Sequence, residues 1–142
     1  MVDPMRVRAK LTALREYRDA LEHLASDRSD PIARYSRRYL VQAGIQVCLD
    51  LANHLIADAG WPTVTEFRDT FTRLEEHDVI DDELARRLRA MVGMRNRLVH
   101  LYDEVDDELV SRAAVEELGD WDAFARAITA YIEAEGSDGD DT

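Results

Sequence analysis

The sequence predicts an all-α protein that folds as an antiparallel up-and-down bundle of four to five helices. Only six glycines and three prolines occur in 142 residues, and most of them lie near predicted helix ends. Apolar residues recur at helical spacing through most of the chain. Short connections between the helices favour antiparallel neighbours. At this length we expect one bundle domain over residues 1–134 and a disordered acidic tail over residues 135–142.

The first two helices both begin with an aspartate followed by a proline, a combination typical of a helix N-terminus. Asp3 precedes a helix predicted over residues 4–26, with one apolar stripe. Asp30 precedes a longer helix that we expect to end near Gly60, because glycine favours the left-handed conformation that closes a helix.

The second helix is predicted to be the central one, because its apolar residues occupy two faces. Gly44 lies in its interior and costs about 1 kcal/mol of helix propensity relative to alanine, so we expect a close helix crossing there. Cys48, the only cysteine, is interpreted as a buried, inert thiol and excludes an intramolecular disulfide. The two apolar faces consist of Leu40, Val47, Leu51 and Leu55, and of Val41, Ile45, Leu49 and Ile56.

Capping residues also mark the remaining helices. Thr63 or Thr65 is expected to cap a short third helix that contributes phenylalanines to the core. The pair Asp81 and Asp82 is expected to cap the fourth helix. Asp106 starts a fifth helical segment, which Gly119 is expected to interrupt.

The fourth helix carries a cluster of positive charges, whereas the chain as a whole is negatively charged. The net charge is -12, and residues 101–142 carry all of it. From Leu84 to Tyr102 there is no acidic residue, which indicates an anionic partner. The positive charges of this stretch are Arg86, Arg87, Arg89, Arg95 and Arg97.

Arg95 lies on the apolar seam of this helix, four residues after Met91 and three before Leu98. A guanidinium stays charged, so burying it requires a carboxylate or phosphate partner, and its own helix supplies no carboxylate within one turn. Arg95 and His100 are about 140° apart around an ideal helix, so one straight helix does not aim both at one atom. A homodimer with a twofold axis would bring Arg95 of one chain to His100 of the other.

The side chains of Arg95, Asn96 and His100 suit phosphodiester cleavage. They supply a fixed positive charge, an amide that orients an oxygen, and a proton carrier with a pKa near neutrality. In RNA the 2′-hydroxyl is the nucleophile, so these groups suffice without a metal. The alternative for His100 is an imidazole that only stabilises the C-terminal end of its helix.

These residues carry a resemblance to a known family. Arg95 followed directly by Asn96, then His100 and Tyr102, resembles the signature of the HepT family of HEPN-domain proteins. The stretch from Gln42 to Gly60 is also similar to that family, and the resemblance extends to about residue 133.

The resemblance implies a homodimeric endoribonuclease toxin of a type VII-like toxin–antitoxin pair, with Arg95 and His100 at a composite site and Asn96 as the polar residue after the arginine. It also implies that Tyr102 is AMPylated by an MntA-like nucleotidyltransferase antitoxin, which silences the nuclease. We expect RNA phosphates to contact Arg86, Arg89, Arg97 and Arg38. For Arg38 and its neighbours Arg34 and Arg37, a solvated face is the favoured alternative.

A function of another class is also open. The chain would then be a non-catalytic companion subunit of a nucleotidyltransferase that binds nucleotide or partner, and the acidic C-terminal region fits this alternative better because it repels RNA. No metal or other cofactor is expected. Asp50 and His54 are one turn apart, but a zinc site needs three or four ligands. With no signal peptide and no apolar run long enough to span a bilayer, we expect a cytoplasmic protein.

Overall fold

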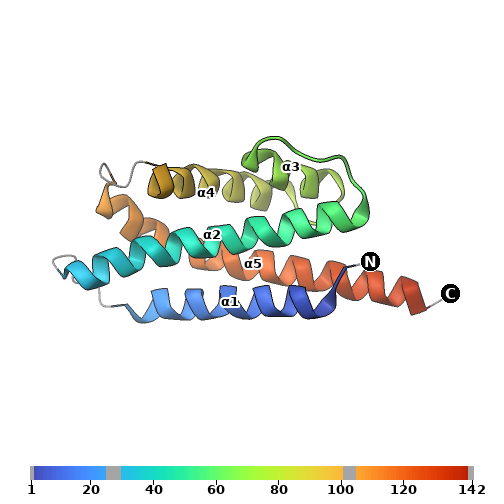
Figure 1. The fold of residues 1–142 in the computed structure, drawn as a ribbon, viewed down its shortest axis with the longest axis horizontal. Helices are drawn as coiled ribbons and strands as arrows, with labels where there is room; N and C mark the ends of the chain where they lie inside the picture. Colours follow the sequence, from blue (N-terminus) through green and yellow to red (C-terminus); the bar gives the residue numbers. More distant parts are fainter. Residues whose placement is uncertain (1, 25–29, 101–104, 141–142) are drawn as a thin grey trace.

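The computed structural model describes residues 2–24, 30–100 and 105–140. Within these residues it contains five helices and no strand, which confirms the predicted all-α bundle (Figure 1). The helices are α1 (Pro4–His23), α2 (Pro31–Ala59), α3 (Phe67–Glu76), α4 (Asp82–His100) and α5 (Asp107–Asp140).

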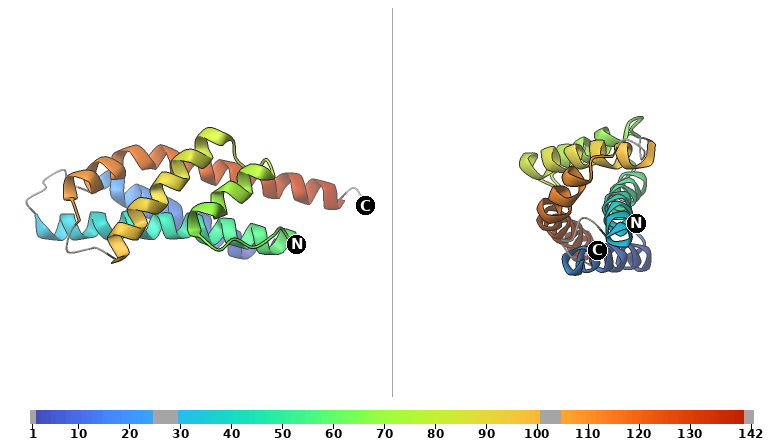
Figure 2. Two further views of the ribbon diagram at one scale, coloured as in Figure 1. Left: turned by 90° about the horizontal axis from the view of Figure 1, so that it is seen from above. Right: turned by 90° about the vertical axis from the view of Figure 1, so that its left-hand side faces the viewer.

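The four longer helices alternate in direction along the molecule, and α3 packs against α4 and α2 (Figure 1). Helix α4 crosses α2 obliquely, as the view from above shows (Figure 2). Helix α2 contacts each of the other four helices, which confirms it as the central element.

Side-chain caps set four of the predicted helix starts. In each case an aspartate carboxylate accepts a hydrogen bond from a backbone N–H of the first turn, which has no partner within the helix. Gly60 ends α2 in the left-handed region with φ of 73°, as predicted. The capping bonds join Asp3 to Met5 (3.1 Å), Asp30 to Ile32 (3.0 Å), Asp81 to Leu84 (2.8 Å) and Asp106 to Glu108 (2.9 Å).

Two local predictions are wrong. Helix α3 begins after Glu66 without a side-chain cap, so neither Thr63 nor Thr65 caps it. Helix α5 continues through Gly119, because the apolar face that follows packs into the core and outweighs a helix cost of about 1 kcal/mol. Helix α5 is described as far as Asp140, and the division of the chain at residue 134 stays a prediction.

The close crossing predicted at Gly44 is formed by α2 and α5. A Cβ atom at Gly44 would lie 2.1 Å from Cη2 of Trp121, so only a glycine admits this ring. Cys48, on the same helix, has no exposed surface, and burial raises the pKa of its thiol far above the ordinary value. This confirms a buried cysteine that is not poised as a nucleophile.

Helix α2 corrects the expectation that no segment is apolar and long enough to span a bilayer. Within the described residues, Pro31–Ala59 is long and apolar enough to span a bilayer, judged by length and composition alone. Its position in the centre of the bundle accounts for this composition, because the core helix of a globular domain is apolar on several faces.

Glu117 on α5 gives the fold a predicted pH dependence. It is 8% exposed, and burial, together with repulsion from Asp120 and Glu116, raises its pKa to about 8. A carboxyl group with a raised folded pKa loses stability as the pH rises from its unfolded value of about 4.3 to that folded pKa. We expect Glu117→Gln to stabilise the fold by on the order of 3 kcal/mol at pH 8 and to remove this dependence.

Denaturant unfolding at pH 5 and pH 8 measures this effect. The matched control is Glu133→Gln, because Glu133 is an exposed glutamate of the same helix and is not among the groups that raise the pKa of Glu117. Equal stability of wild type and Glu117→Gln at pH 8 would contradict the prediction.

Candidate active site

Arg95 is half-buried where α4 meets α2 and α3. Its Nε and Nη2 atoms both donate to Oε1 of Gln46 on α2, at 3.1 and 2.9 Å. Its Nη1 atom donates to Oδ1 of Asn96 at 3.2 Å. The guanidinium carbon lies 5.1 Å from the centroid of the Phe67 ring, a cation–π contact. Three side chains from three helices therefore hold this one cation.

The partner of Arg95 differs from the predicted one. Instead of a carboxylate or phosphate, the structure places the amide oxygen of Gln46 against the guanidinium. An amide satisfies the donors without neutralising the charge, so the positive charge remains available to an anion. Sequence reasoning missed Gln46 and Phe67. The sequence feature that could have identified Gln46 is its position one turn before Asp50, on the same face of the helix.

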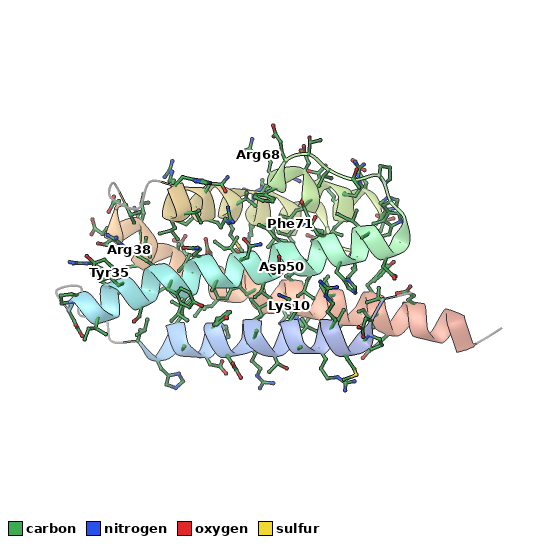
Figure 3. All side chains as sticks on the ribbon, viewed as in Figure 1. Lys10, Tyr35, Arg38, Asp50, Arg68 and Phe71 are labelled. Carbon is green, nitrogen blue, oxygen red and sulfur yellow. The ribbon has the colours of Figure 1, made fainter. Side chains whose placement is uncertain are left out.

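Asp50 is occupied by hydrogen bonds. Its Oδ1 accepts from Nε2 of Gln46 at 2.9 Å, and its Oδ2 accepts from Nζ of Lys10 at 3.1 Å. Figure 3 shows Lys10 and Asp50 facing each other between α1 and α2. The part of the chain that the structure describes contains no group of three or more potential metal-ligating side chains. Asp50 thus orients the amide of Gln46, which contacts Arg95.

His100 is exposed at the last residue of α4. The described partners of Arg95 are Gln46, Asn96 and Phe67, so the single chain brings Arg95 and Asn96 together without His100. Tyr102, the predicted modification site, lies outside the described residues.

The four arginines predicted to contact phosphate fall into two pairs. Arg86 and Arg97 are exposed on α4. Arg89 donates to Thr72 at 3.2 Å and to Glu75 at 3.4 Å.

Arg38 donates from Nε and Nη2 to the two carboxylate oxygens of Asp107, at 2.7 and 2.9 Å. Both Arg38 and Arg89 therefore already have carboxylate partners, and their contact with RNA phosphate stays a prediction. The favoured alternative of a solvated face is wrong for Arg38, because its side chain is only 19% exposed.

The acidic C-terminal helix pairs with basic residues elsewhere in the bundle. Besides Arg38, it pairs Asp120 with Arg87 at 3.2 Å and Asp122 with Arg18 at 3.1 Å. Several carboxylates of α5 thus form ion pairs within the molecule. Arg95, in contrast, is held by neutral groups.

An open cleft is lined by two of the residues that contact Arg95, although Arg95 itself does not line it. It has a volume of about 380 Å³ and lies between the start of α3 and the last turns of α4, with Phe67, Gly93 and Asn96 among its lining residues. Gln46 occupies the Nε/Nη2 edge of the guanidinium, so the Nη1/Nη2 edge is left to Asn96 and to an incoming oxyanion. The arrangement is suited to binding a phosphate group.

A family model and two known proteins match the sequence of this chain. The model of the HepT-like family, described as ribonuclease HepT-like, matches residues 7–128. The chain is 32% identical over 90 residues to the mRNA nuclease HepT of Shewanella oneidensis, covering 63% of this chain and 68% of that protein. It is 26% identical over 139 residues to the tRNA nuclease HepT of Aphanizomenon flos-aquae, covering 92% of each.

A solved structure agrees with these matches. The tri-AMPylated HEPN toxin of Shewanella oneidensis, in complex with MNT antitoxin, superposes with a TM-score of 0.81 at 26% identity, covering 87% of this chain and 96% of that chain. The family match spans most of the described bundle and includes Arg95, Asn96 and His100. This chain therefore belongs to the ribonuclease HepT-like family.

Proposed function

We propose that this protein is a cytoplasmic, metal-independent endoribonuclease toxin that acts as a homodimer. Arg95 of one chain and His100 of the other would form each site. The observation that carries the proposal is the Arg95 guanidinium, held by an amide and an aromatic ring instead of a carboxylate. The exposed position of His100 leaves it free to meet a second chain.

The proposed reaction uses the 2′-hydroxyl of RNA as the nucleophile. His100 takes the proton from this hydroxyl as the 2′-oxygen bonds to phosphorus. The bond between phosphorus and the 5′-oxygen breaks as that oxygen takes a proton from water, which leaves a 2′,3′-cyclic phosphate and a 5′-hydroxyl. Arg95 stabilises the charge that develops on the phosphorane, and Asn96 orients a phosphate oxygen. No step in this scheme needs a metal.

We also propose that an MntA-like nucleotidyltransferase antitoxin silences the enzyme by AMPylating Tyr102. The AMPylated Shewanella toxin in complex with its antitoxin supports this regulation. Tyr102 follows His100 by two residues, so an added phosphate would pair with Arg95 or Arg97 and its bulk would occupy the volume of the scissile phosphate.

This regulation predicts a mutant that escapes the antitoxin. After co-expression with the nucleotidyltransferase, intact-mass spectrometry should show one or more adenylyl additions on wild type and none on Tyr102→Phe. The mutant should remain an active, toxic nuclease, because the hydroxyl of Tyr102 takes no part in the proposed cleavage. Tyr39→Phe removes an exposed tyrosine of α2 and serves as the control.

The opposite result would favour the other class of function. A wild-type chain that stays unmodified in a stable complex with an active nucleotidyltransferase would contradict the mechanism. It would favour the non-catalytic companion subunit.

A further inference from the structure

A chain of side-chain hydrogen bonds runs through three helices and ends at Arg95. Lys10 on α1 donates to Asp50 on α2, Asp50 accepts from Gln46, and Gln46 accepts from Arg95 on α4. We propose that Gln46 is a positioning residue for the Arg95 guanidinium, and that Asp50 fixes the orientation of the Gln46 amide. The inference rests on the proposed function, since it assigns these residues to the same phosphate-binding site.

The orientation of the Gln46 amide follows from its two neighbours. A glutamine amide has one accepting end and one donating end. Asp50 presents a carboxylate oxygen 2.9 Å from Nε2, and an ionised carboxylate only accepts. The NH₂ group must face Asp50, so the oxygen must face Arg95.

Lys10 is suited to its place in this chain. It is the only lysine among the 18 basic residues. Its ammonium is a single point of charge that contacts Oδ2 of Asp50 and leaves Oδ1 to Gln46. An arginine fork would tend to take both oxygens, as Arg38 does with Asp107.

The position of the chain on α2 gives it rigidity. Gln46 and Asp50 are one turn apart on the central helix, whose other faces are packed into the core. Groups held on a rigid element keep a site within the narrow range of geometry that catalysis requires. The pair of Lys10 and Asp50 is more than a third exposed, so it contributes geometry more than stability.

The first test separates positioning from charge at residue 46. Gln46→Leu removes the acceptor and should lower kcat for RNA cleavage by about 10- to 100-fold, because a small displacement of a catalytic group has effects of that size. Gln46→Glu should mainly raise KM, because a carboxylate would neutralise Arg95 against the substrate phosphate. Gln42→Leu, one turn earlier on α2, is the matched control and should keep wild-type kinetics.

The second test uses a residue that does not touch Arg95. In Asp50→Asn, Lys10 should take the single remaining oxygen, so the new NH₂ group faces Gln46 and favours the flipped amide. We expect a loss of kcat of about 10-fold. Adding Lys10→Met should restore most of it, because the amide introduced at residue 50 can then turn its oxygen to Gln46. A purely structural role for these residues predicts no rescue.

A readout without RNA separates this inference from the proposed function. The Nε–H resonance of Arg95, assigned by its loss in Arg95→Lys, should shift in Gln46→Leu and in Asp50→Asn and stay in place in Asp58→Asn. If wild type cleaves no RNA but these shifts occur, the proposed function fails and the positioning role stands. Wild-type kinetics and an unmoved Arg95 resonance in Gln46→Leu would overturn the inference.

Discussion

RNA cleavage should fall by about 100- to 1,000-fold in Arg95→Ala, the usual cost of removing one group that stabilises transition-state charge. His100→Ala should lose about 100- to 10,000-fold, because general acid–base catalysis contributes that much. Both variants should stay folded, since Arg95 is half-buried and His100 is exposed at a helix end. Cleavage rates of a labelled RNA, with circular dichroism melting, measure both effects.

The control for this comparison is Arg8→Ala, which removes an exposed arginine of α1. Chelator should leave the wild-type rate unchanged. Wild-type cleavage by either Arg95→Ala or His100→Ala would contradict the proposed site.

Mixing the two inactive variants tests whether the site is composite. A heterodimer of Arg95→Ala and His100→Ala contains one site with both residues intact if they act across the interface, so activity should partly return. No recovery would indicate sites built within one chain. A monomer by light scattering at micromolar concentration would contradict the homodimer itself.

Gly44→Ala should destabilise the bundle by about 3 kcal/mol or more, because overpacking a filled core forces side chains and backbone to move. The added Cβ would lie 2.1 to 2.5 Å from three carbons of the Trp121 ring. That ring is only 1% exposed, so it is packed against neighbours that would have to shift with it.

Gly119→Ala is the matched control for Gly44→Ala. Gly119 is also inside a helix, but nothing lies within 4 Å of its added Cβ. It should stabilise the protein by up to about 1 kcal/mol, the difference in helix propensity. Denaturant unfolding measures both variants, and equal stability of Gly44→Ala and wild type would show that the crossing tolerates a side chain.

Local sequence patterns predicted most of the fold. Aspartate caps at Asp3, Asp30 and Asp81 defined helix starts, and Gly60 defined a helix end, because capping depends only on residues within one turn. The two apolar faces of α2 predicted a central helix. The same local argument failed at Gly119, where packing of the rest of α5 outweighs the propensity of one residue.

The sequence by itself determined an all-α bundle, its central helix, the glycine at the helix crossing and the candidate site on α4. The tertiary structure alone decided which side chains meet across helices. It paired Arg95 with Gln46, and it directed Asp107 of α5 to Arg38. The physical reason is that caps and periodicity act within a few residues, whereas pairing across helices depends on crossing angle and axial register, which are set by the packing of the whole core.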